Sequence, residues 1–148
     1  MMKKRNVFVA LALGLAAQLA LAQATPVGLW KTIDDDGKTE KSLVRITEKD
    51  GVLTGAIEKV FDPSKQTAVC DLCEDDRKNK SIVGLQIIRN VKQDPDDKAL
   101  WGAGGQVLDP EKGKTYKTRL KPIEGGKKLE MRGYLGFFYR TQIWVRVE

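Results

Sequence analysis

The sequence predicts an all-β protein, a single closed antiparallel up-and-down β-barrel of about eight strands. Short stretches rich in β-branched and aromatic residues recur at close, regular intervals, and Gly, Pro or Asp turns separate them. No stretch shows a long apolar period of 3.6 residues flanked by helix caps. Closure removes exposed sheet edges, and about eight strands enclose an interior that is filled or holds one small ligand. A β-sandwich is the alternative.

Residues 1–24 have the pattern of a cleaved signal peptide, which leaves one domain at residues 25–148. Three basic residues at positions 3–5 precede an apolar run over 7–21, and small residues favour cleavage after Ala24. The run is shorter than the ~20 residues of a membrane span. No cysteine follows for lipid attachment. We therefore expect a periplasmic or secreted protein without stable membrane insertion.

The turns divide the domain into eight expected strands. Alternation with Lys and Arg in the sixth places Tyr116 and Leu120 toward the interior. The last strand is ambiguous because polar residues share a face with Trp144. Either Trp144 is an exterior residue covered by a neighbour, or the register breaks near Gln142. The expected strands span 27–32, 42–48, 52–61, 81–91, 100–108, 114–121, 128–134 and 138–147.

Composition excludes several kinds of chemistry. Histidine is absent, which removes His-dependent triads, His-ligated metals and His acid–base catalysis. The acidic turns at 34–36 and 94–97 lack the ligand pattern of a calcium loop and contain residues that turns prefer. We expect no cofactor, no metal and no enzymatic activity.

The charge is unevenly distributed. The formal charge of +6 falls to +3 without residues 1–24, yet residues 112–148 carry ten Lys or Arg against three Glu. A solvated strand face explains this excess, and acidic glycans or lipid headgroups are the alternative partners. Since no nucleic-acid recognition helix or aromatic RNA-binding pair accompanies it, we expect no nucleic-acid partner.

Cys70 and Cys73 form a CxxC motif with three interpretations. In an exported protein the pair favours a structural disulfide that ties the long polar loop over 64–80, contributing about 2 kcal/mol. A redox site is less consistent, because acidic residues around the sulfurs disfavour the thiolate. A metal site would need two further ligands, and only carboxylates are available.

The aromatic residues indicate where a ligand would bind. We expect Trp101, Tyr116, Met131 and Tyr134 to line or rim a cavity, with the tyrosine hydroxyls orienting the ligand. A plain barrel core is the alternative for each of them.

Gly28-x-Trp30, near the start of the domain, resembles the Gly-x-Trp signature on the first strand of lipocalins. That resemblance implies that Trp30 lies at the closed end of the barrel, covered by an arginine from near the end of the chain. Arg146 and Arg140 are the candidates, and such a cation–π contact contributes about 0.5–2 kcal/mol.

Motifs along the whole domain resemble a family of exported bacterial proteins known as domain of unknown function 2147. The resemblance implies a lipocalin- or calycin-like barrel and no established activity. Unlike ordinary lipocalins, the chain shows no long helix after the barrel. The matching stretches are Gly28-Leu29-Trp30, Cys70-x-x-Cys73, Gly84-Leu85, Trp101-x-x-Gly104-Gly105-x-x-x-Asp109-Pro110, Gly113-Lys114-x-Tyr116, Arg132-Gly133-Tyr134-Leu135-Gly136 and Gln142-x-Trp144-x-Arg146.

Three functional hypotheses follow. The leading one is a non-enzymatic carrier that holds a small, mostly apolar ligand in the barrel. The second is an envelope-associated structural or stress-related protein with a filled barrel that acts through its surface. The third is a thiol–disulfide enzyme that uses Cys70 and Cys73. The sequence predicts no particular oligomeric state.

Overall fold

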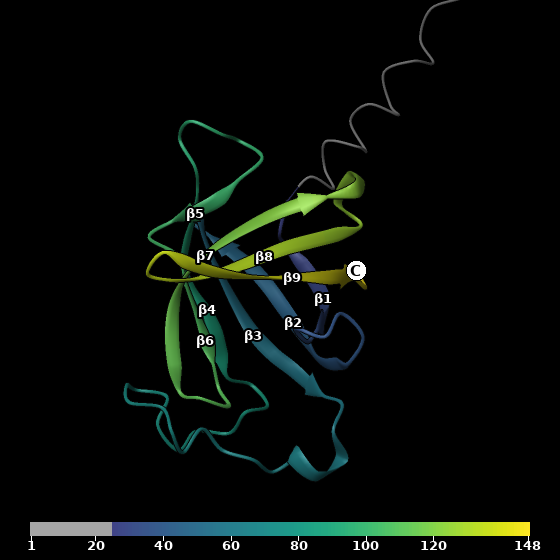
Figure 1. Ribbon diagram of the computed structural model, residues 1–148, viewed down its shortest axis with the longest axis vertical. Coiled ribbons are helices and arrows are strands. Elements are labelled where there is room, and N and C mark those ends of the chain that lie inside the picture. Colours follow the sequence, from purple (N-terminus) through teal and green to yellow (C-terminus); the bar gives the residue numbers. More distant parts are fainter. Residues whose placement is uncertain (1–24) are drawn as a thin grey trace, which may run out of the picture.

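The structure is a computed structural model that describes residues 25–148. The predicted signal peptide, residues 1–24, lies outside the described residues. Nine strands and two short 3-10 turns make up the domain (Figure 1). In chain order they are β1 (Gly28–Ile33), β2 (Glu40–Lys49), β3 (Val52–Val60), η1 (Pro63–Lys65), β4 (Gln86–Gln93), β5 (Trp101–Ala103), β6 (Gln106–Asp109), β7 (Lys114–Ile123), η2 (Glu124–Gly126), β8 (Lys128–Leu135) and β9 (Phe138–Arg146).

The strands close into an antiparallel barrel. The sheet runs β3-β2-β1-β9-β8-β7-β5-β4-β6, and pairing of β3 with β4 closes the circle. Both β5 and β6 pair with β4 on one side and with β7 on the other. They are therefore two halves of one barrel strand, which leaves eight positions around the barrel. The predicted closed barrel of about eight strands is confirmed.

Two glycines split the fifth expected strand. The sequence predicts one strand over 100–108, whereas the structure bends between β5 and β6. Gly104 has a φ of 72°, and a Cβ on Gly105 would lie 2.8 Å from the Val91 side chain. The chain turns sharply here because only glycine has both the backbone freedom and the small size.

The fourth expected strand begins five residues later than predicted, at Gln86 instead of Ser81. The segment before it is a turn in which Leu85 donates its N–H to the Ile82 carbonyl at 3.1 Å, and Gly84 has a φ of 91°. The apolar residues of this segment pack in or against the core. Gly84 and Leu85 still exchange hydrogen bonds with Ile57 of β3 at 2.7 and 2.9 Å, but the turn keeps the segment from forming a regular strand. Apolar character alone therefore predicted too long a strand.

The structure shows that both expectations for Trp144 are wrong. β9 pairs with β8 from Phe138 to Val145 without interruption, so the register does not break. Trp144 is 2% exposed whereas Ile143 is 37% exposed, so the face that carries Trp144 points into the barrel. The polar residues on this face lie inside because each end of the barrel supplies them with hydrogen-bond and ion-pair partners.

The loop over 61–85 crosses the end of the barrel that lies at the bottom of Figure 1. The predicted disulfide between Cys70 and Cys73 is confirmed, with a Cα–Cα distance of 5.4 Å and both residues buried. The turn between β6 and β7 packs against this small ring, because a Cβ on Gly113 would collide with the Leu72 carbonyl. The loop is thereby held beneath the strands.

Candidate functional site

One end of the barrel is closed by Trp30 and Arg146. Trp30 is fully buried and donates its indole N–H to the Pro26 carbonyl at 2.7 Å. The Arg146 guanidinium lies over the indole, 4.2 Å from the ring centroid. Arg140, the other candidate suggested by the sequence, lies far along β9 toward the opposite end. Burial lowers the pKa of Arg146, but a guanidinium stays charged in proteins.

Backbone carbonyls accept hydrogen bonds from the half-buried Arg146 guanidinium. Its nitrogens donate to the carbonyls of Thr25 (2.6 Å), Val27 (2.8 Å) and Gly126 (2.5 Å). Gly28 leaves the room for this arrangement, since a Cβ there would overlap the guanidinium and the Glu148 carbonyl. Gly28 and Trp30 therefore both contribute to closing this end of the barrel: Trp30 packs against Arg146, and Gly28 leaves space for it.

The other end opens into a cavity of about 1030 Å³. Its inner wall consists of buried, mostly apolar side chains, and its rim consists of charged side chains from loops and strand ends. The inner wall includes Ile57, Val60, Ile87, Val107, Leu108, Met131 and Trp144. The rim includes Asp34, Asp35, Lys41, Lys65, Glu111, Lys112 and Arg140. Apolar walls with a few polar groups are typical of small-molecule sites.

The structure brings two of the four predicted ligand residues to this cavity. Tyr116 of β7 and Met131 of β8 both line it. Trp101 is 9% exposed and packs in the core, paired with Leu120, and it does not line the cavity. Tyr134 points out of the barrel beside Tyr139, with ring centroids 5.9 Å apart, and does not line it either.

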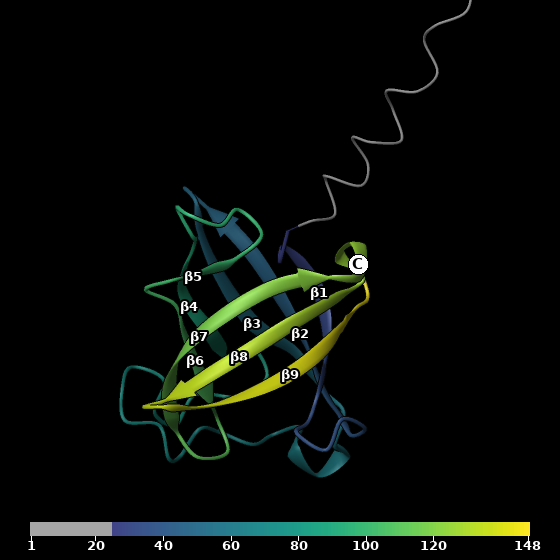
Figure 2. The same cartoon turned by 45° about the horizontal axis from the view of Figure 1, so that its top comes forward.

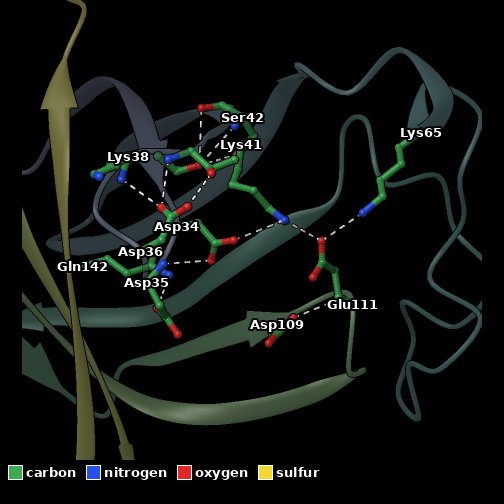
Figure 3. A network of polar contacts seen from close by, with 12 residues as sticks. Asp34, Asp35, Asp36, Lys38, Lys41, Ser42, Lys65, Asp109, Glu111 and Gln142 are labelled. Carbon is green, nitrogen blue, oxygen red and sulfur yellow. Dashed lines mark hydrogen bonds and ion pairs between the residues drawn. The ribbon is translucent and has the colours of Figure 1, made fainter.

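A polar chain inside the wall connects β9 to the β1–β2 turn. Trp144 donates its indole N–H to Gln142 Oε1 at 3.0 Å, and Gln142 Nε2 donates to Asp35 Oδ1 at 2.8 Å. The other oxygen of Asp35 pairs with Arg140 at 2.9 Å. Figure 3 shows Gln142 beside Asp35, and both residues line the cavity. This chain explains why polar residues of β9 face the interior.

A second polar bridge crosses the rim at Glu111, in the turn between β6 and β7 (Figure 3). Glu111 Oε1 accepts from Lys41 Nζ of β2 at 2.7 Å and from Lys65 Nζ of η1 at 3.1 Å. These bonds lower the pKa of the Glu111 carboxyl, and the same contact raises the pKa of Lys41. Three elements distant in sequence therefore meet over the cavity.

The sequence does not identify these rim residues because they are ordinary turn and strand-end residues. Asp36, the neighbour of the rim residue Asp35 in the same turn, illustrates this, since it accepts from the backbone N–H groups of Lys38 and Thr39 at 2.8 Å. The Thr39 hydroxyl and these backbone bonds lower the pKa of Asp36. Such bonds are the reason that turns prefer Asp. The one signal in the sequence is that the apolar pattern of β9 places polar residues on the Trp144 face.

The described part of the chain has neither a metal-binding cluster nor a membrane-spanning helix. Within residues 25–148, no group of three or more Cys, Asp or Glu residues could hold a metal ion. The same residues contain no helix of the length and apolar character that a membrane crossing requires. Both sulfurs of the Cys70–Cys73 disulfide belong to buried residues.

The geometry defines a class of protein: a small antiparallel barrel sealed at one end and hollow at the other, as in lipocalins. The chain belongs to the family described as "Uncharacterized protein conserved in bacteria (DUF2147)", whose model matches residues 28–146. A solved structure with a similar fold is protein HP1028 of the human pathogen Helicobacter pylori, which belongs to the lipocalin family. The two chains are 22% identical, 84% of each is covered, and the TM-score is 0.69. No curated protein matches the chain.

Proposed function

We propose that this protein is an exported, non-enzymatic carrier that binds one small, mostly apolar molecule in the barrel. The observation that carries the proposal is the cavity of about 1030 Å³ with buried apolar walls. Its volume slightly exceeds the usual range for small-molecule sites, roughly 300–1,000 Å³. A molecule in it would contact Tyr116 and Met131.

The charged rim supports an amphipathic ligand with its polar end at the mouth. Lys41, Lys65 and Arg140 provide cations within the rim, each already paired with a carboxylate. A ligand without any polar group would leave these pairs undisturbed, and one with an anionic end would compete with Glu111 or Asp35 for them. The buried walls offer the apolar part of the ligand an environment without water.

The cavity favours a carrier over the two alternatives. A barrel that acts only through its surface has no need of a hollow interior, and a closely packed core is more stable. A thiol–disulfide enzyme needs a sulfur that a substrate can reach. Cys70 and Cys73 are 0% and 1% exposed, which disfavours that role.

Two binding experiments test the proposal. Native mass spectrometry of protein purified from its own host should reveal a copurifying small molecule. In addition, a dansyl-labelled fatty acid should bind the purified protein with one-to-one stoichiometry and increased fluorescence. Absence of both signals would overturn the carrier hypothesis.

A matched pair of variants locates the binding site. Gly133 lines the cavity, and a Cβ there would lie 3.8 Å from its nearest neighbours, Tyr116 and Val107. Gly133→Leu should therefore fill the cavity without a backbone clash and weaken binding of the dansyl probe at least tenfold. Thr115→Leu adds a similar side chain at an exposed position of β7 and should leave the affinity within twofold. Equal affinity of both variants would place the probe outside the barrel.

A further inference from the structure

Charge is segregated along the chain and therefore across the barrel. Residues 25–111 carry 13 Lys or Arg against 17 Asp or Glu, a formal charge of −4, whereas residues 112–148 carry ten against three, a formal charge of +7. The second segment forms β7, β8 and β9, which lie side by side on one face (Figure 2). Arg140 and Arg146 lie on the inner face of β9, but the outer face of these strands still carries Lys117, Arg119, Lys121, Lys128 and Arg132 against Glu130. This face is therefore cationic, while the rest of the barrel is mildly acidic.

The outer surface of these three strands combines cations with aromatic rings. Lys117, Tyr134 and Tyr139 lie next to each other across the strands, and Arg119, Arg132 and Thr141 form the next row. The Arg132 guanidinium lies 4.1 Å from the centre of the Tyr139 ring. Glu130 is the one acidic residue among the described residues of β7, β8 and β9.

The hairpin between β8 and β9 extends this face with exposed apolar side chains. The exposed fractions are 64% for Leu135, 102% for Phe137, 79% for Phe138 and 56% for Tyr139. Several large apolar residues at one hairpin tip are uncommon on a soluble surface and mark an interaction site. The tip adjoins the mouth, because Leu135, Phe138 and Tyr139 also line the cavity.

We propose that the face formed by β7–β9 and the Leu135–Tyr139 tip docks on an anionic phospholipid surface. The tip would insert Phe137 among the acyl chains, while Lys114, Lys117 and Arg132 would contact the headgroup phosphates. The protein would lie on the bilayer and not span it. Because the tip borders the mouth, docking would place the cavity opening at the lipid surface, where an apolar ligand can enter without crossing water.

Charge and shape favour this partner over a second copy of the chain. A symmetric self-contact through the same face would bring two cationic surfaces together, which is unfavourable. A soluble polyanion would account for the cations but not for the exposed phenylalanine at the tip. An anionic bilayer accounts for both features.

Sedimentation with vesicles tests the proposal on the mature protein. We expect little binding to vesicles of pure phosphatidylcholine, strong binding when about 40% is phosphatidylglycerol, and weakening as NaCl rises from 50 to 500 mM. Binding that is independent of the phosphatidylglycerol fraction, or no binding to any vesicle, would overturn the proposal.

Two variants with matched controls test whether the β7–β9 face and its tip bind the vesicles. Phe137→Ser should weaken binding about tenfold, whereas Val147→Ser, which removes a 51% exposed apolar residue beyond the opposite end of β9, should not change it. Lys114→Gln with Lys117→Gln should also weaken binding about tenfold, whereas Lys49→Gln with Lys92→Gln, exposed residues of β2 and β4, should have less than a twofold effect. Equal effects of a variant and its control would overturn the assignment.

Two further measurements separate the remaining outcomes. Sedimentation velocity without vesicles should show the same species for wild type and Phe137→Ser; a dimer that Phe137→Ser abolishes would replace the bilayer with a second copy as the partner. Docking does not rest on ligand binding. Phe137, Lys114 and Lys117 do not line the cavity, so these variants should bind the dansyl probe as wild type does. Gly133→Leu should in turn dock normally, so a failure of either proposal leaves the other testable.

Discussion

The closed and open ends of the barrel each place an arginine of β9 on the inner face, but the two arginines meet different partners. Arg146 lies over the buried Trp30 ring and donates to backbone carbonyls. Arg140 has a side chain that is 72% exposed and pairs with the Asp35 carboxylate. Main-chain carbonyls and a buried ring keep fixed positions, whereas exposed side-chain ion pairs are readily exchanged. The difference indicates that the contacts of the closed end are fixed, whereas those of the open end can be rearranged.

Replacing Trp30 tests the closed end most severely. Trp30→Ala removes a fully buried indole and should lower the free energy of unfolding by about 3–5 kcal/mol. Phe138→Ala at the open end, where the side chain is 79% exposed, should change it by less than about 0.5 kcal/mol. Urea unfolding followed by circular dichroism measures both. A loss below about 1 kcal/mol for Trp30→Ala would contradict the comparison.

The two arginines can be compared directly. Arg146→Gln leaves several carbonyls without a charged donor and should cost about 2–3 kcal/mol in urea unfolding. Arg140→Gln breaks an exposed pair and should cost about 0–1 kcal/mol. Salt at 0.5 M should leave the stability loss of Arg146→Gln nearly unchanged and should further reduce the loss of Arg140→Gln. Equal costs for the two variants would show that the ends do not differ in this way.

The Cys70–Cys73 disulfide stabilises the loop beneath the open end. Its ring is short, so reduction should lower the free energy of unfolding by only about 2 kcal/mol. Hydrogen exchange should become faster in the loop over 61–85, while the amides around Trp30 stay protected. Cys70→Ala with Cys73→Ala should match the reduced wild type. Loss of protection at the closed end would show that the two ends are coupled.

Small effects are expected for the pH dependence of the rim. Since ion pairs lower the folded-state pKa of Glu111, their contribution is complete above the unfolded-state pKa of about 4.3. It is lost as the pH falls through the lower folded-state value. Acid should therefore release Lys41 and Lys65 at a cost of less than about 1 kcal/mol. NMR titration of these lysines tests this, with Glu111→Gln as the control that no longer responds.

Asp75 allows the same test away from the rim. Bonds from Arg77, which is only 3% exposed, lower the pKa of Asp75 to about 2. Its contribution is thus complete above the unfolded-state value of about 3.9 and is lost as the pH falls toward the folded-state value. Asp75→Asn should raise the pH midpoint of acid unfolding. An unchanged midpoint would mean that Arg77 is held by Gln86 alone.

Patterns with local causes were predictable. Turn residues and the two-residue period of strands arise from backbone geometry, so the number and order of barrel strands follow from the amino-acid pattern alone. The sequence also favoured the disulfide over a redox or metal site, because acidic neighbours disfavour the thiolate and only carboxylates could complete a metal site. The predicted strand boundaries were wrong at Gly84 and Gly104, where a positive φ at glycine interrupts the strand although the neighbouring residues are apolar.

The candidate site was predictable only in part. Tyr116 and Met131 alternate with outward-facing residues, so their inward direction follows from the strand pattern. Trp101 also lies inside the barrel, but it is too far from the mouth to line the cavity. The alternation of a strand tells which side chains point inward, but not how far from the mouth they lie. Tyr134 lies on the outside because β8 places Gly133 and Leu135 on its inner face.

By itself the sequence predicted the class of fold and favoured the disulfide, because turn residues, the two-residue strand period and the spacing of the cysteines are local features. Only the tertiary structure decided which end of the barrel is hollow and which residues surround its mouth. Asp35, Gln142 and Glu111 become a rim when the barrel closes and brings β1, β9 and the β6–β7 turn together. Contacts between such distant segments depend on the curvature and register of the whole sheet, which no local pattern encodes.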